Sequence, residues 1–127
     1  MSHFTRIKTQ IVEKKYLMQA LRDLNYAYEE GDVKIRGFGG NRTGVEIKIP
    51  TGNRGYDIGF RKSDGAYELI ADWYGIHDID QGQFLRKVTQ RYVYLVTKEK
   101  LEAQGFTLAA EEVERDGRVH LTMRRMV

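Results

Sequence analysis

An alternating, tyrosine-rich stretch, YDIGFRKSDGAYELIADW (56–73), holds the polar residues best suited to chemistry in this chain. The candidate polar cluster in this stretch and in the loop after it is Asp57, Arg61, Glu68, Asp72 and His77. General acid–base catalysis needs a carboxyl or imidazole group whose pKa is displaced towards the working pH. An enzyme built here would use Asp57, Asp72 and His77.

The same alternation also has a structural explanation, which we favour. Successive side chains of a strand point to opposite faces, so two apolar rows are predicted to line a core. These rows are Tyr56, Ile58 and Phe60, and then Tyr67, Leu69, Ala71 and Trp73. Asp57 and Asp72 fall on the opposite face, where we expect them near solvent or beside Arg61. Arg61 itself is placed to pair with Glu68 across the strands, a contact worth ~0.2–1 kcal/mol.

A basic, glycine-rich segment, KIRGFGGNRTG (34–44), is the strongest hint of nucleic-acid binding. Its Arg-Gly-Phe-Gly matches the first half of an RNA-recognition motif, whose rings stack on bases, but the residues after it do not supply the second half. Phosphate-binding glycine patterns are not completed either. An RNA-binding interpretation would use Arg36, Phe38, Arg42, Arg54 and Tyr56. The alternative is a glycine-rich bend between edge strands with solvated arginines.

Metal and nucleophilic chemistry have little support. The chain has no cysteine, and its serines are Ser2 and Ser63, neither of which has a neighbouring base pattern. The run His77-Asp78-x-Asp80 offers one nitrogen and two oxygens, fewer than the four ligands of a closed zinc site. We therefore predict no metal and no cofactor, and expect Asp78 and Asp80 to shape a loop and cap a helix.

Length and charge describe an ordinary globular protein. The chain has 127 residues, predicted to form a single domain over 1–127, with a net charge of +3. Charge is uneven, because residues 34–62 hold seven Lys or Arg against two acids. An anionic partner such as RNA would suit that segment. No apolar run approaches the ~20 residues of a membrane span, and we expect a cytoplasmic protein.

Hydrophobic periodicity predicts a mostly antiparallel sheet with two helices packed on one face, an α+β fold. Helices are expected over 13–24 and from Asp80 to about 104, where Gln83 completes a capping box. Strands are expected within 1–9, 26–28, 33–35, 45–49, 56–62, 67–73, 106–114 and 119–124, with turns at 30–32 and Asp116-Gly117. The strand–helix–strand opening leaves room for a ferredoxin-like element. Phe60, Trp73, Tyr92 and Leu95 are predicted to share one core.

Several segments of the chain resemble a known family. MSHFTRIKTQI, IRGFGGN, GYDIGF, YELIADWYGI, FLRKVTQRYVY and the closing EEVERDGRVHLTMRR are similar to the hypothetical chloroplast reading frame thirty-five family, domain of unknown function twelve fifty-seven. The resemblance implies a soluble cytoplasmic or stromal protein, and it brings no activity or catalytic residues with it. Family members often carry Leu-Trp or Trp-Trp before a glycine where this chain has Trp73-Tyr74-Gly75.

We therefore expect a non-enzymatic protein-interaction module that offers a sheet edge or an aromatic rim to another protein. A single-stranded RNA-binding domain is the first alternative, and an enzyme using the carboxylates is the second.

Overall fold

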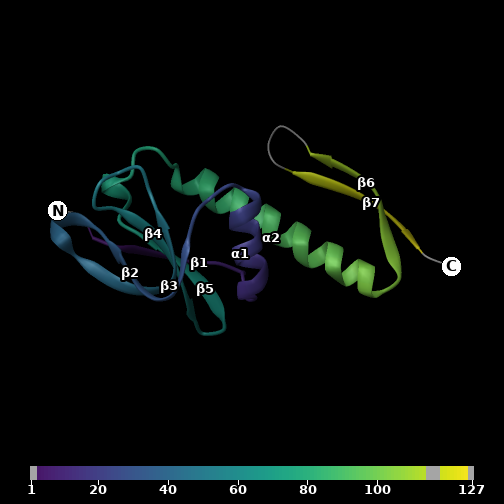
Figure 1. The fold of residues 1–127 in the computed structure, drawn as a ribbon, viewed down its shortest axis with the longest axis horizontal. Coiled ribbons are helices and arrows are strands. Elements are labelled where there is room, and N and C mark those ends of the chain that lie inside the picture. Colours follow the sequence, from purple (N-terminus) through teal and green to yellow (C-terminus); the bar gives the residue numbers. More distant parts are fainter. Residues whose placement is uncertain (1–2, 114–117, 126–127) are drawn as a thin grey trace.

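The computed structural model describes residues 3–113 and 118–125. Within them, five strands form an antiparallel sheet, and two further strands form a separate hairpin (Figure 1). The strands are β1 (Thr5–Lys8), β2 (Glu29–Arg36), β3 (Arg42–Pro50), β4 (Asp57–Ser63), β5 (Ala66–Ala71), β6 (Phe106–Val113) and β7 (Val119–Arg125). The helices are α1 (Lys14–Asp23) and α2 (Gln81–Ala103), and short 3-10 turns span Phe38–Gly40 and Trp73–Gly75. The predicted α+β class is confirmed.

The strand order in the large sheet is β1-β5-β4-β3-β2. Strands β2 to β5 form a meander, and β1 joins its far side by pairing with β5. The strand–helix–strand opening therefore places β1 and β2 at opposite edges, an order that differs from a ferredoxin-like element.

Local signals mark the start of α2 and the C-terminal ends of both helices. The Asp80 side chain accepts a hydrogen bond of 2.9 Å from the Gln83 amide and caps α2. After α1, Asn25 takes a left-handed conformation with φ of 65°, and Gly105 does the same after α2 with φ of 91°.

One large core lies between the sheet and the helices. It includes Leu17 and Leu21 of α1 together with Phe84 and Val88 of α2. Phe60 and Tyr92 are buried in this core, and Trp73 and Leu95 pack against it half-buried, so the predicted shared core is confirmed. Burial of such side chains, at ~1.5–3 kcal/mol each, is the main source of stability.

Two predicted strand boundaries are wrong. No strand covers 26–28, and β2 instead runs continuously from Glu29 through the predicted turn. Gly31, with φ of 132°, and a register shift between Glu30 and Val33 form an irregularity that bends the strand without ending it. Strand β5 ends at Ala71, so Trp73 belongs to a 3-10 turn.

The other face of the sheet is also partly covered, which the sequence did not predict. A second cluster there consists of Ile35, Val45 and Ile70, with Phe4 packed against it. Gly59 makes this possible, because a Cβ at that position would lie 2.6 Å from Val45 Cγ1 and 3.0 Å from Ile35 Cγ2. The β2–β3 hairpin thus curls over the start of β4.

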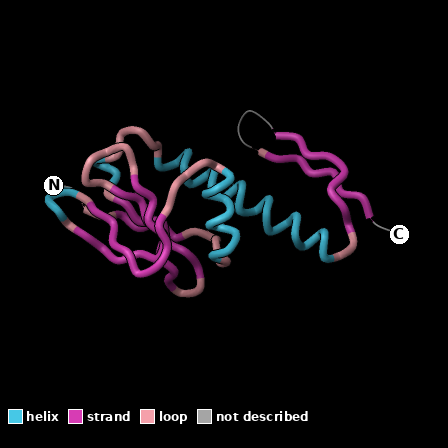
Figure 2. The backbone as a smooth tube through the Cα atoms, in the orientation of Figure 1, coloured by secondary structure: helices cyan, strands magenta, loops and turns pink. Residues whose placement is uncertain are grey.

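The C-terminal hairpin stands apart from the large sheet and packs on the far half of α2 (Figures 1 and 2). Its register pairs Phe106 with Arg125 and Val113 with Val119, as expected for the predicted hairpin. The predicted turn at Asp116-Gly117 lies outside the described residues.

Candidate functional site

Asp57 is fully buried at the start of β4, and its carboxylate is bonded to Arg36. Oδ2 accepts hydrogen bonds from the Arg36 backbone amide (2.8 Å) and from Nε (3.0 Å), and Oδ1 accepts one from Nη2 (3.1 Å). Lys48 Nζ lies 4.0 Å from Oδ2. The expectation that Asp57 lies near solvent or beside Arg61 is wrong, because the curled hairpin brings Arg36 over it.

Asp72 is also buried, with 2% of its surface exposed, and it bonds to one residue of the β2–β3 loop and one residue of the turn after β5. Its Oδ2 accepts from the Phe38 amide (3.0 Å), and its Oδ1 accepts from the Tyr74 amide (3.3 Å). Gly37 fits tightly between these carboxylate contacts, since a Cβ there would lie 3.0 Å from the Phe4 ring and 3.1 Å from Asp72 Cβ. The expectation of a solvent-facing Asp72 is therefore also wrong.

The Asp72 carboxylate positions a pair of residues with exposed rings, Phe38 and Tyr74, which we call the aromatic rim. Phe38 is 41% exposed and Tyr74 is 71% exposed. Their centroids lie 6.4 Å apart with an interplanar angle of 86°, an edge-to-face arrangement. Figure 2 shows the two 3-10 turns that carry them as short cyan segments at the end of the sheet away from the hairpin.

A hollow of about 440 Å³ lies beside Tyr74, and we call it the rim hollow. Its lining residues are Asn53, Arg54, Tyr56, Tyr74, Gly75 and His77. Gly75 packs directly on the Tyr56 ring, because a Cβ at position 75 would lie 2.1 Å from the Tyr56 Cζ atom and the ring would have to move. Backbone and ring therefore pack in direct contact at the floor of this hollow.

Hydrogen bonds hold the two loops around the rim hollow together. Asp78 accepts from the Gly52 amide (3.0 Å) and from Asn53 Nδ2, while Asn53 Oδ1 accepts from the His77 amide (3.1 Å). Burial acts to raise the pKa of Asp78, but the hydrogen bonds from Gly52 and Asn53 and the nearby His77 outweigh it and lower the pKa below 3.8. The expected loop-shaping role of Asp78 is confirmed, and the carboxylate is ionised at neutral pH.

The structure divides the residues proposed for RNA contact. Arg54 and Tyr56 line the rim hollow, and Arg42 is exposed on β3. Phe38 belongs to the aromatic rim. Arg36 differs, because its guanidinium is held by Asp57.

The polar cluster predicted on the hairpin does not form one site. Arg61 and Glu68 lie opposite each other in the β4–β5 register, but the predicted contact between their side chains is not among the ion pairs of the described residues; the Arg61 guanidinium instead donates to the Gly44 carbonyl at 3.1 Å. His77 is exposed at the rim hollow, whereas Asp57 and Asp72 bond to Arg36 and to the amides beneath the rim. Tyr74 is the site residue that sequence reasoning missed, and its signal was the departure from the family pattern at Trp73-Tyr74-Gly75.

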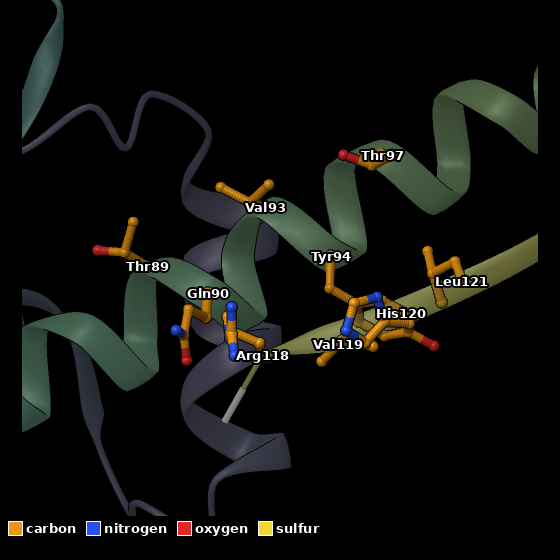
Figure 3. A pocket seen from close by; sticks show the side chains of 9 residues that line it. All are labelled: Thr89, Gln90, Val93, Tyr94, Thr97, Arg118, Val119, His120 and Leu121. Atoms are coloured by element: carbon orange, nitrogen blue, oxygen red, sulfur yellow. The ribbon is translucent and has the colours of Figure 1, made fainter. Parts of the chain in front are cut away.

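A second hollow, the helix–hairpin groove, separates α2 from β7 (Figure 3). It measures about 480 Å³ and is lined by Thr89, Gln90, Val93, Tyr94, Thr97, Arg118, Val119, His120 and Leu121. Val93 is 52% exposed, although it lies in the middle of α2.

Within residues 3–113 and 118–125, no three His, Asp or Glu side chains come close enough together to hold a metal ion. No helix in that part of the chain combines the length and apolar character that a bilayer crossing requires.

Comparison with known proteins places the chain in a family. Residues 20–122 match the family model described as a protein of unknown function, DUF1257. The chain belongs to the DUF1257 family. Two similar proteins are the uncharacterized protein ycf35 of Cyanophora paradoxa, 34% identical, and that of Guillardia theta, 35% identical, each over 98% of both chains. The ycf35 protein of Pyropia yezoensis is 33% identical over the same share. The resemblance seen in the sequence is thus confirmed, and no solved structure matches this DUF1257 chain.

Proposed function

We propose that this DUF1257 protein is a non-enzymatic binding module that docks a partner protein on the aromatic rim. One observation supports this function. The buried Asp72 carboxylate accepts hydrogen bonds from the backbone amides of Phe38 and Tyr74, the two residues that carry the exposed rings. We further propose that it acts in the cytoplasm, or in the stroma where the protein is made in a plastid.

An interaction surface explains the energetic cost of this arrangement. Burying a carboxylate is unfavourable unless hydrogen bonds compensate it, and here the compensating donors belong to the residues that carry the rings. Tyr74 gains little from its own burial, since most of its surface remains in water. Rigid aromatic side chains at a fixed position are the residues that contribute most to protein interfaces, because little side-chain freedom is lost on binding.

The geometry of the carboxylates supports a positioning role over a catalytic one. Asp57 bonds to the Arg36 amide and guanidinium, and Asp72 bonds to two backbone amides. A general base needs a carboxylate oxygen within reach of a substrate proton. Asp57 and Asp72 are both buried, so a substrate would have to displace the loop that carries Phe38.

Single-stranded RNA binding is the second candidate, and the observation that favours it is the meeting of Arg54 and Tyr56 in the rim hollow. Binding to phosphates releases counterions, so the RNA affinity would fall steeply with added salt. Replacing Arg42 and Arg54 by Gln would then flatten the salt dependence. No detectable binding of single-stranded RNA at low salt would exclude this candidate.

Affinity purification from the native host tests the proposed function, with co-purifying protein and RNA both identified. A double variant, Phe38→Ala with Tyr74→Ala, is expected to lose the protein partner while remaining folded. Val12→Ala is the matched control, because Val12 is 46% exposed on a different part of the chain. A partner that is retained by the double variant as well as by the control would contradict docking at the rim.

A further inference from the structure

The charge and shape of the rim hollow describe the segment that it would bind. We infer that the partner presents an acidic segment with one aromatic side chain, which inserts into the rim hollow between Tyr56 and Tyr74. This inference rests on the proposed function and adds the chemistry of the partner.

The first argument is unpaired positive charge. Ion pairs within 4.0 Å are formed, for example, by Lys14, Arg36, Lys48 and Arg91. Arg54 lines the rim hollow and Arg42 is exposed on β3, and neither takes part in those pairs. Asp78, which follows His77, keeps its negative charge, but its oxygens accept from the Gly52 amide and the Asn53 side chain, and it is not paired with Arg54. Carboxylates on a partner would therefore meet unpaired arginines, and complementary charge accelerates and orients docking.

The second argument is the shape of the hollow. The hollow has a volume of about 440 Å³, which leaves room for one large side chain. This volume lies within the range of ~300–1,000 Å³ that is typical of ligand-binding clefts. Tyr56 is fixed against Gly75, and the Asp78, Asn53 and His77 hydrogen bonds fix the surrounding loops. A hollow that is formed before binding costs little ordering entropy when it is filled.

The third argument favours a peptide over RNA. Proteins that bind single-stranded nucleic acid present aromatic faces on which successive bases stack. Phe38 and Tyr74 meet at 86°, so one ring presents its edge to the face of the other. Two perpendicular rings do not form a continuous stacking platform. Of the two rings, Tyr74 lines the rim hollow, where it can contact a single inserted side chain.

NMR titration of the full chain with short probes tests the inference. The probes are an acetylated, amidated pentapeptide of sequence Glu-Glu-Trp-Glu-Glu, the same peptide with Gln in place of Glu, the same acidic peptide with Ala in place of Trp, and hexauridylate. We expect the acidic aromatic peptide to shift the amide signals of Asn53, Gly75 and His77. We expect the neutral peptide and the alanine peptide to bind at least about tenfold more weakly, which corresponds to a loss of ~1.4 kcal/mol in binding free energy.

Two variants locate the contact. Arg54→Gln should weaken binding of the acidic peptide by about tenfold, because one charged contact is lost. Arg86→Gln is the matched control, because Arg86 is exposed on α2 and does not line the rim hollow, and it should change nothing.

Each other outcome overturns the inference in a distinct way. Equal affinity for the acidic and neutral peptides would refute the charge argument while leaving docking at the rim intact. If hexauridylate shifts the amide signals and none of the peptides does, both the inference and the protein-binding function are refuted in favour of RNA binding. No shift with any probe at millimolar concentration would refute the inference, and the host co-purification would still decide the proposed function independently.

Discussion

Phe38 and Tyr74 are held together through a shared buried carboxylate as well as through their rings. Their amides donate to the two oxygens of Asp72 at 3.0 and 3.3 Å, and their rings meet edge to face with centroids 6.4 Å apart. One residue lies in the β2–β3 loop and the other follows β5. A single buried side chain therefore sets the geometry of a surface feature formed by two distant segments.

Replacing Asp72 by Ala is expected to destabilise the protein by ~2–4 kcal/mol, because two amides lose their acceptor in a buried site. Urea denaturation followed by circular dichroism measures the change. Asp80→Ala is the control, since loss of this exposed helix cap should cost only ~1 kcal/mol. If Asp72→Ala lowers the free energy of unfolding no more than Asp80→Ala does, the Asp72 carboxylate does not hold the loop.

Replacing Gly75 by Ala should displace the Tyr56 ring and cost ~1–3 kcal/mol, as overpacking of a filled site does. Gly82→Ala is the matched control in the first turn of α2, where the nearest atom to a new Cβ is 3.5 Å away. That change should be neutral or stabilising by up to ~1 kcal/mol, because alanine favours the helix. Thermal unfolding of both variants checks the pair, and equal stability of the two would be inconsistent with the packing described at the floor of the hollow.

Tyr67 predicts a loss of stability at high pH. Burial, with the Glu46 and Glu30 carboxylates as smaller causes, raises the pKa of its hydroxyl from 10.0 to about 12. Because the folded pKa lies above the unfolded one, this stabilisation is complete below pH 10 and is lost as the pH rises from 10 to 12. Tyr67→Phe keeps the ring and removes the titration, so its stability should fall less over that interval, by ~2 kcal/mol. Identical pH profiles for the two proteins would contradict the burial of the hydroxyl.

Much of this fold could be predicted from the sequence, because strand alternation and helix capping depend on residues that are close together in the chain. Alternation placed Ile58 and Phe60 in the main core, and it placed Asp57 on the opposite face. The position of Asp80 indicated a helix cap, and its side chain caps the start of α2.

The surroundings of the carboxylates could not be predicted in this way. The opposite face was expected to be solvated, but the absent side chain of Gly59 lets Val45 and Ile35 approach and brings the β2–β3 hairpin across the sheet. That contact joins segments far apart in sequence, and no periodicity encodes it. Arg36 was accordingly interpreted as a surface cation, although its guanidinium is bonded to Asp57.

The most direct test of the aromatic rim is photo-crosslinking in the native host with benzoylphenylalanine, one site at a time. Position 74 carries an exposed ring in the rim, and position 86 is an exposed control on α2. We predict that the probe at position 74 crosslinks a specific protein, that the probe at 86 does not, and that adding Phe38→Ala to the position-74 protein weakens the crosslink. The same protein captured equally from both positions, or RNA captured in its place at position 74, would contradict a protein-docking rim.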